Sequence, residues 1–426
     1  MERNENVEKL LTTVLKLGFS EDVKNQVREN MNNGLAEFSA YEQVKMGGDT
    51  VSYQLNFSPS KSAANTNVYL NGIDVMLEKG INVPHKTVLG LDTREVETLL
   101  MNKPDAEMVN VGNKDEFDKL MFVHNAKAEE KMKFLGENAP EVFNALYVKY
   151  KPEVEVMITT EMAKQQEELE KSLWKMNSFS TYYNLTKLEL YNALDGGAIF
   201  KTLFKVNKED QSQNPQTDPQ QDNKYKAWVR VDFDNKRADG SYEMEMFHDN
   251  RKFDLREVLA LYNFKETSNR FDRAEVVKFL QKGSMFTLTN LGESGEKQVN
   301  VRANPEFKNL DLFKLSGESI RNINAYRKNP MAVEVGASVS LKKANDVRHP
   351  LEQETISREK KNEMAARFST MKSAINSDDK KNLSSKEIST SNENKTASSK
   401  QGIVDRRTRN TARTVSESDT SQGISR

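Results

Sequence analysis

The segment from Thr186 to residue 206 decides the fold class. It reads Thr186-Lys187-Leu188-Glu189-Leu190-Tyr191-Asn192-Ala193-Leu194-Asp195-Gly196-Gly197 and continues as Ala198-Ile199-Phe200-Lys201-Thr202-Leu203-Phe204-Lys205-Val206. Thr186 with Glu189 three residues later is the pattern of a capping box, which begins a helix. Gly197 predicts the end of that helix, because glycine takes the left-handed conformation after a helix C-terminus at little cost. The residues that follow have the composition of a strand, so the segment predicts a helix followed by a strand.

The same pattern occurs twice more in the chain. The two further copies read Asp92-Thr93-Arg94-Glu95-Val96 and Asp272-Arg273-Ala274-Glu275-Val276, and the copies start 94 and 86 residues apart. Asp92 and Asp272 are predicted N-caps in the place of Thr186. Spacing this long is not that of a solenoid. It predicts duplicated small α+β modules.

The two later copies continue in the same way after their helices. Strand-like segments follow at 198–206 and 225–233 in the second copy, and at 284–290 and 297–303 in the third, after Gly283. The unit is therefore a helix, a strand, a loop and a second strand. The first copy is the weakest, because Pro104 stands where its first strand would begin.

The sequence before these copies predicts a helical and then a stranded region. Residues 7–33 have helical periodicity with a break at Gly18, and segments 42–46, 51–57 and 68–77 alternate as strands do. Gly47-Gly48-Asp49 suits a tight hairpin turn. Residues 115–176 predict further helices, of which the last has a narrow apolar stripe at Met162, Leu169, Leu173 and Met176. That stripe suits either a solvated helix on the body or a short coiled-coil contact.

These patterns predict an α+β fold with small antiparallel sheets, packed helices, repeated helix–strand–strand modules and a disordered C-terminal tail. We expect an N-terminal helix and small antiparallel sheet over residues 1–90, and a mainly helical insertion over 91–180. Duplicated α+β modules follow over 181–325. Residues 326–426 form a largely disordered, basic, Ser/Thr-rich tail, because a segment with so few apolar residues cannot offset its ordering entropy.

Charge is divided unevenly between the body and this tail. The chain has 426 residues and a net charge of −1, yet residues 341–426 hold 18 Lys and Arg against 12 Asp and Glu, which leaves 45 against 52 in residues 1–340. A basic tail indicates contact with an anionic partner, such as nucleic acid, a membrane or an acidic protein. Solvation of the tail by its own charges is the alternative reading.

The composition also narrows the cellular location and the chemistry. The chain has no cysteine, which excludes disulfides, thiolate zinc sites and cysteine nucleophiles and fits a reducing compartment. No run of apolar residues approaches the length of a membrane span, and Met1-Glu2-Arg3-Asn4-Glu5 lacks the pattern of a secretory signal. We therefore expect a soluble cytoplasmic protein with no membrane insertion.

No motif in the sequence predicts catalysis, a metal or a cofactor. The four histidines, His85, His124, His248 and His349, do not form a metal-ligand pair. The stretch 232–240 resembles a calcium loop only superficially, since Lys236 and Arg237 stand where a ligand and a glycine are needed. The stretch 292–297 differs from a phosphate loop in spacing and lacks its final hydroxyl. Both are better explained as turns, and we expect a non-enzymatic protein without cofactors.

The strand over residues 225–233 offers the most informative surface. Its alternation places Tyr225, Ala227, Val229, Val231 and Phe233 inward and Lys226, Trp228 and Arg230 outward. An exposed aromatic ring between two cations can stack a nucleic-acid base and hold phosphates, and Lys201 and Lys205 add charge from the preceding strand. The alternative is structural: Arg230 pairs across the turn with Glu243 or Glu245, and Trp228 packs under a helix.

Three segments carry a resemblance to a known group of proteins. They are residues 225–236, residues 302–308 and the helix over 185–194, and together they resemble an uncharacterised family from Bacteroidetes genomes and their conjugative elements. The likeness covers roughly residues 185–315 and, more loosely, 5–78, and segment 101–180 looks like an insertion. The resemblance implies an accessory protein of a mobile or conjugative element. It suggests contact with DNA or with proteins of a DNA-transfer complex; the alternative is a protein–protein scaffold with no nucleic-acid role.

Overall fold

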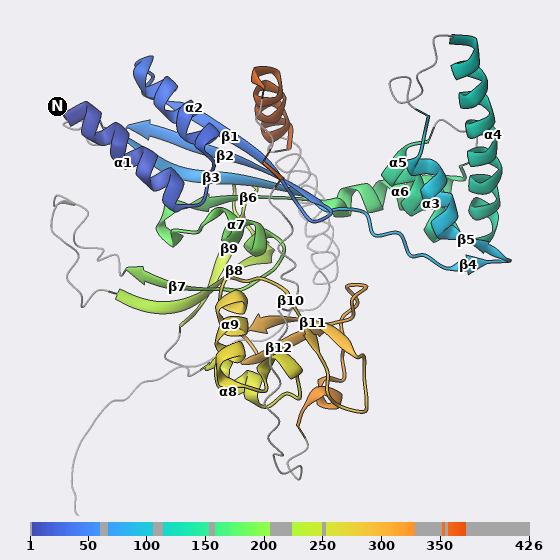
Figure 1. Cartoon of the computed structure of the whole chain (residues 1–426). Coiled ribbons are helices and arrows are strands. Elements are labelled where there is room, and N and C mark those ends of the chain that lie inside the picture. Colours follow the sequence, from blue (N-terminus) through green and yellow to red (C-terminus); the bar gives the residue numbers. More distant parts are fainter. Residues whose placement is uncertain are drawn as a thin grey trace, which may run out of the picture. The chain divides into compact units, whose positions relative to one another are not determined.

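The computed structural model describes eight ranges of the chain: residues 2–59, 67–104, 114–152, 158–204, 224–248, 253–328, 352–353 and 357–371. Contacts divide the chain into two compact units, Met1–Lys372 and Ser373–Arg426, and all described residues belong to the first. This unit is an α+β fold built of helices and small antiparallel sheets (Figure 1), which confirms the predicted fold class. The finer division into four regions stays a prediction.

The first sheet is antiparallel and carries two helices on one face. Its strands are β1 (Phe38–Met46), β2 (Asp49–Pro59), β3 (Val68–Glu78), β6 (Trp174–Ser180) and the short β13 (Glu352–Gln353), in the order β13-β1-β2-β3-β6. Helices α1 (Glu2–Lys16) and α2 (Glu21–Asn32) lie across the sheet (Figure 1). The sheet buries alternate residues such as Val51, Tyr53 and Leu55 beneath them, as the period of a half-buried strand requires.

A helical region is inserted between β3 and β6. It contains the short strands β4 (Thr87–Val88) and β5 (Leu91–Asp92), and helices α3 (Thr93–Met101), α4 (Lys114–Asn138), α5 (Pro140–Tyr150) and α6 (Thr160–Leu173). Although β3 and β6 are distant in sequence, Glu78 lies opposite Trp174, and the Lys79 amide donates to the Leu173 carbonyl at 2.8 Å. The insertion therefore leaves the sheet and returns to it at one place.

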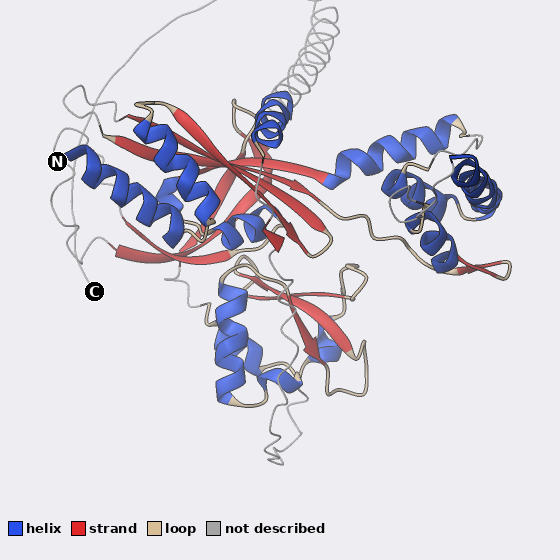
Figure 2. Ribbon diagram, turned by 45° about the horizontal axis from the view of Figure 1, so that its top comes forward, coloured by secondary structure: helices blue, strands red, loops and turns tan. Residues whose placement is uncertain are grey.

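Two α+β modules follow in the chain. The first has helix α7 (Lys187–Leu194) and strands β7 (Ile199–Phe204), β8 (Lys224–Lys236) and β9 (Tyr242–His248), with the 3-10 turn η1 (Thr181–Tyr183) before it. The second has helices α8 (Leu255–Ala260) and α9 (Arg270–Gln281), strands β10 (Phe286–Thr289), β11 (Gln298–Asn304) and β12 (Asn309–Phe313), and the 3-10 turns η5 (Lys265–Thr267) and η6 (Ile323–Tyr326). Each module pairs its strands antiparallel in chain order. Figure 2 shows the strands of the chain in red and its helices in blue.

The two modules meet at two glycines. Gly283 is the left-handed residue after α9, as Gly196 is after α7, and a Cβ atom built on the next residue, Gly197, would lie 2.2 Å from the Gly283 carbonyl oxygen. The Asn192 side-chain amide donates to the Lys282 carbonyl at 2.9 Å and to the Ser284 hydroxyl at 3.0 Å. Glycine is needed here because any side chain would collide with the neighbouring backbone.

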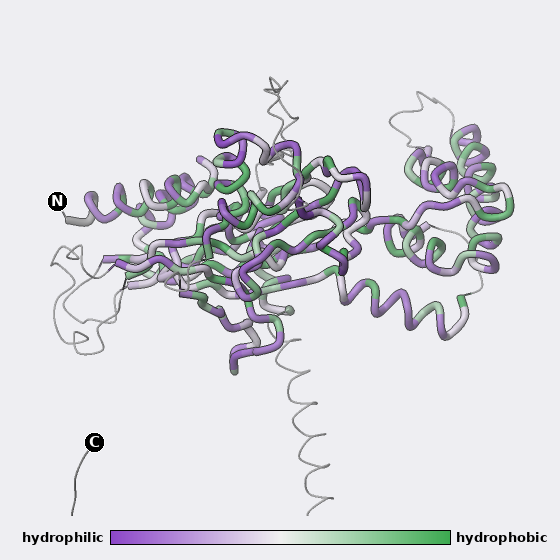
Figure 3. Tube along the Cα trace, turned by 90° about the horizontal axis from the view of Figure 1, so that it is seen from below, coloured by the Kyte–Doolittle hydropathy of each residue, from purple (hydrophilic) through white to green (hydrophobic). Residues whose placement is uncertain are grey.

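Buried apolar residues gather in three clusters among the described residues. The first cluster lies between α1, α2 and the first sheet and extends to α7, β7 and one face of β8. The second lies within the module from α8 to β12 and reaches the other face of β8. The third lies within the insertion. Hydrophobic and hydrophilic residues are interspersed along the described part of the chain (Figure 3). Strand β8 thus has a core on each of its two faces.

Several predicted boundaries are confirmed and others are wrong. Asp92 and Thr186 are N-caps, and Thr186 forms the expected capping box with Glu189. Asp272 is not a cap, because Asn269 accepts hydrogen bonds from the first amides of α9 and the helix begins three residues earlier. The left-handed residue after α7 is Gly196, with φ +94°, rather than Gly197. The first copy has a helix, α3, but the described residues directly after it, 102–104, contain no strand.

The end of the insertion also differs from the prediction. Residues 174–176 were expected to be helical, yet α6 ends at Leu173 and Trp174–Ser180 form β6, because pairing with β3 outweighs the local helical pattern. Helix α6 buries Met162 and Gln166 and exposes most of its remaining surface, as a solvated helix on the body would.

The part of the chain after η6 is described only in places. A helix over residues 358–371 buries Met364 and Phe368. The loop predicted between the strand segments 198–206 and 225–233 lies almost wholly outside the described residues. Of the predicted tail over 326–426, the structure describes residues 326–328, 352–353 and 357–371. No described helix is long and apolar enough to cross a membrane.

Candidate functional site

The predicted nucleic-acid surface on β8 is largely buried. Trp228 was expected to face outward, but it is only 2% exposed, and its ring packs against Phe200 and Phe253 at centroid distances of 5.1 and 5.4 Å. The inward placement of Ala227, Val229 and Val231 is confirmed. The prediction that Trp228 is exposed is wrong because buried clusters cover both faces of β8. Alternate side chains of β8 therefore enter two different cores, and neither set faces only solvent.

The cations predicted beside Trp228 are mostly paired with carboxylates. Arg230 donates to Glu245 on β9 and to Glu306, each at 2.8 Å, which is the cross-strand pairing of the structural alternative. Lys201 donates to Glu189 at 2.9 Å. Lys226 is exposed and makes no ion pair with the described residues. Lys205 lies outside the described residues.

A cluster of charged side chains joins the first sheet to both modules. We call it the junction cluster; its members are Asp49, Lys79, Lys175, Tyr191, Asp195 and Arg302. Lys79 bridges the two carboxylates, with its ammonium 2.7 Å from Asp49 and 2.8 Å from Asp195. Arg302 on β11 donates both to the Asp195 carboxylate and, at 3.0 Å, to its backbone carbonyl.

The charges of the junction cluster shift one another's protonation. Burial alone would raise the pKa of Asp195, but Arg302 and Lys79 hold it below its ordinary value. Burial raises the pKa of Tyr191, and the nearby Asp195 and Asp49 carboxylates raise it further. The Tyr191 hydroxyl donates to Asp49 at 2.8 Å and so stays protonated. Proton transfer from these groups near neutral pH is therefore disfavoured, and the cluster acts as an electrostatic junction.

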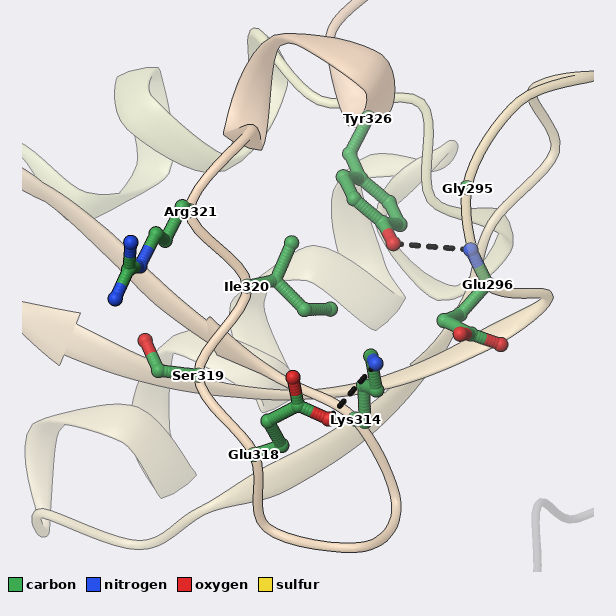
Figure 4. Close-up of a pocket in the computed structure, with 8 residues that line it drawn as sticks. All are labelled: Gly295, Glu296, Lys314, Glu318, Ser319, Ile320, Arg321 and Tyr326. Carbon is green, nitrogen blue, oxygen red and sulfur yellow. Dashed lines mark hydrogen bonds and ion pairs between the residues drawn. The ribbon is translucent and has the colours of Figure 1, made fainter.

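A pocket of about 620 Å³ lies in the last module (Figure 4). It is lined by Gly295, Glu296, Lys314, Glu318, Ser319, Ile320, Arg321 and Tyr326. Lys314 and Glu318 pair with each other at 2.8 Å, and the Tyr326 hydroxyl accepts the Glu296 amide at 2.9 Å. These polar groups satisfy one another, so the lining does not present a convergent catalytic set.

The N-terminal part of α4 presents apolar side chains outside the buried clusters. We call this the α4 apolar surface; its residues are Phe117, Leu120, Met121, Phe122 and Val123. Leu120, Phe122 and Val123 are 44%, 75% and 51% exposed, and Phe117 and Met121 are half-buried. The buried residues of α4 are His124, Ala128, Met132 and Leu135, all further along the helix. The helix therefore extends past the core that its second half forms with α3 and α5.

Sequence reasoning missed both the junction cluster and the α4 apolar surface. The cluster draws residues from β2, β6, α7, β11 and the ends of two elements, so no local pattern contains it. The α4 surface had a signal, because the run Leu120-Met121-Phe122-Val123 is too apolar for one stripe of a helix that is buried on one side. Among the described residues no group of side chains could hold a metal ion.

Comparison with protein-family models, curated proteins and solved structures finds no match to this chain.

Proposed function

We propose that this chain is a non-enzymatic cytoplasmic scaffold that binds another protein through the α4 apolar surface. The observation that carries the proposal is the exposure of Leu120, Phe122 and Val123 within about one turn of α4. Contiguous exposed apolar residues of this kind mark sites of protein–protein contact. The first ten residues of α4 form a helical segment roughly 15 Å long, with apolar side chains on more than one side of it, for a partner to bind.

The chemistry of α4 indicates what the partner presents. A helix end with exposed apolar side chains on more than one side can insert into an apolar groove of another protein. The first turn of α4 carries Asp115 and Glu116. We therefore expect a groove with apolar walls and basic residues at the end that receives the first turn.

Contact with DNA has less support from the side chains of the body. The predicted stacking residue Trp228 is buried, and Arg230 and Lys201 are paired with carboxylates. Of the described residues predicted to bind nucleic acid, Lys226 alone is exposed without an ion pair. An accessory role in a mobile or conjugative element is compatible with a scaffold and stays a prediction from the sequence resemblance.

A cross-linking experiment in the producing cells tests the scaffold proposal. A photoreactive phenylalanine analogue is placed at Phe122 and, as a control, at Phe271, which is 84% exposed at the start of another helix. We expect a discrete protein adduct from position 122 that is absent from position 271. The matched variants Phe122→Ser and Phe271→Ser then test binding of the purified partner. Only Phe122→Ser should weaken it, with unfolding midpoints unchanged in both.

The same preparation tests the DNA alternative. The wild-type chain is mixed with single- and double-stranded DNA at several salt concentrations, because phosphate contacts make affinity fall steeply with salt. Salt-dependent DNA binding together with no specific adduct from position 122 would overturn the scaffold proposal.

A further inference from the structure

The outer edge of β1 has little strand pairing among the described residues. Strand β13 pairs with Val44 and Lys45 and with no other residue of β1. The rest of this edge, from Phe38 to Gln43, has no neighbouring strand in the described part of the chain. An open edge of this length can pair with a strand of another chain, because its outward N–H and C=O groups form a template for one.

A side chain of α2 takes the place of a strand at the middle of this edge. The Gln26 amide donates from Nε2 to the Tyr41 carbonyl at 2.9 Å, and its Oε1 atom accepts the Tyr41 backbone N–H at 3.0 Å. Both backbone groups of Tyr41 are thus bonded to one side chain. A residue on an adjacent antiparallel strand would exchange the same two bonds with Tyr41.

Asp22 fixes the orientation of the Gln26 amide from a second direction. The Nε2 atom of Gln26 also donates to the Asp22 carboxylate at 2.9 Å, one turn earlier on α2. Because a carboxylate accepts hydrogen bonds and does not donate them, the nitrogen of the amide has to face Asp22. Gln26 is also only 7% exposed, although glutamine is mostly found at protein surfaces. The fold therefore holds this amide in place against Tyr41.

Alternation along β1 shows which residues this amide protects. The N–H and C=O groups of Tyr41 point away from β2, so those of Ser39 and Gln43, two positions to either side, point the same way. Two copies of β1 placed antiparallel about Tyr41 would pair Tyr41 with Tyr41 and Ser39 with Gln43. Such an arrangement has two-fold symmetry, in which the same surface of each copy satisfies the other. Gln26 occupies its central pair in both copies.

We propose that Gln26 closes the β1 edge against a second copy of this chain, and that its removal lets two copies pair through β1. The partner is a second copy because the edge is complementary to itself in the antiparallel direction. Strand β13 limits the contact at one end, since it covers Lys45, the next residue that points outward. The α4 apolar surface belongs to the insertion and takes no part in this pairing.

Analytical ultracentrifugation of the full chain tests this role of Gln26. Gln26→Leu removes both bonds to Tyr41 and frees its backbone groups. We expect this variant to self-associate about tenfold more tightly than the wild type, because a dimer regains hydrogen bonds that the monomer has lost. Gln166→Leu is the matched control, since it removes another buried amide, 9% exposed and bonded to Asn144, from a helix of the insertion. It should leave the oligomeric state unchanged.

A labelled peptide with the sequence of β1, residues 38–46, tests the edge itself by fluorescence anisotropy. It should bind the Gln26→Leu chain and not the wild type, and methylation of its Tyr41 backbone nitrogen, which removes the N–H donor, should abolish binding. Gln26→Glu replaces Gln26→Leu if the latter does not fold, because it keeps the side-chain size and loses only the donor to the Tyr41 carbonyl.

Three results would overturn the proposal. The first is a folded variant that stays as monomeric as the wild type and does not bind the peptide. The second is equal binding of the peptide and its methylated form, which would show contact away from the backbone edge. The third is binding of the peptide to the wild-type chain, which would show that Gln26 does not close the edge.

Discussion

The Lys187 ammonium donates to a Glu42 carboxylate oxygen at 3.0 Å, and both side chains are only 4% exposed. This ion pair connects β1 in the first sheet to the first turn of α7. The other Glu42 oxygen accepts the amide of Ser20, the N-cap of α2, at 3.4 Å. The backbone of Lys187 takes part as well, since its carbonyl accepts the Tyr53 hydroxyl at 3.0 Å.

Removal of one member of this pair should destabilise the fold strongly. Lys187→Met leaves the Glu42 carboxylate buried without its counter-charge, and we expect a loss of about 3–5 kcal/mol in the free energy of unfolding by urea. The double variant Glu42→Leu with Lys187→Met should regain part of that loss. Lys9→Met, which breaks an exposed pair with Glu5, should leave the midpoint unchanged. A Lys187→Met midpoint equal to that of Lys9→Met would contradict the prediction.

Trp228→Ala should act through stability. The side chain fills the core between Phe200 and Phe253, so its truncation leaves a large cavity and should lower the free energy of unfolding by about 3–5 kcal/mol. Phe271→Ala, at an 84% exposed position, is the control and should have little effect. A Trp228→Ala chain with wild-type stability and weakened single-strand binding would instead restore the stacking prediction.

The junction cluster should make stability depend on pH in the acid range. The pKa of Asp195 is lower in the folded chain than in the unfolded chain. The ionised carboxylate therefore stabilises the fold at pH values above the unfolded pKa. This stabilisation is lost as the pH falls through the pKa of the folded chain. Asp195→Asn should therefore lower stability at pH 7 and flatten its fall below about pH 4. If the stability of the Asp195→Asn variant falls with pH as steeply as that of the wild type, other carboxylates control the acid dependence.

The helical insertion should be removable. The Lys79–Leu173 backbone contact brings its two ends together, and its apolar residues form a cluster separate from the other two. Replacement of residues 80–172 by the turn Asn-Gly should give a folded chain with the β3–β6 pairing intact. Circular dichroism and the cooperativity of thermal unfolding measure this. A shortened chain that loses cooperative unfolding would show that the sheet depends on the insertion.

The end of the chain should divide into a part that matters for stability and a part that does not. A chain truncated at Ser377 should melt at the wild-type temperature, because the removed segment has the composition of a disordered tail. Phe368→Ala should lower the melting temperature, since that side chain is 1% exposed. A truncation that lowers the melting temperature by several degrees would show that the tail packs on the body.

Local features of this chain could be predicted from its sequence, because they depend on neighbours in the sequence. The Thr186 capping box, the hairpin at Gly47 and the turn before β9 involve residues within a few positions of one another. The strand pattern of β8 was also correct, with Ala227, Val229 and Val231 on one face. Alternation does not reveal what covers the opposite face, and so the burial of Trp228 could not be predicted.

The remaining errors and omissions arise from contacts between distant segments. Trp174, Lys175 and Met176 follow a helix without a glycine or proline, and only their pairing with β3 makes them a strand. The junction cluster depends on the same kind of contact, since Arg302 reaches Asp195 from another module. Such pairs have no local signature in a single sequence.

The contact between Gly197 and Gly283 restricts substitution at both positions. A methyl group added to Gly197 would be aimed at the backbone of Gly283. A larger residue at position 197 would therefore need a compensating backbone shift in the other module. These two positions are expected to change together or not at all.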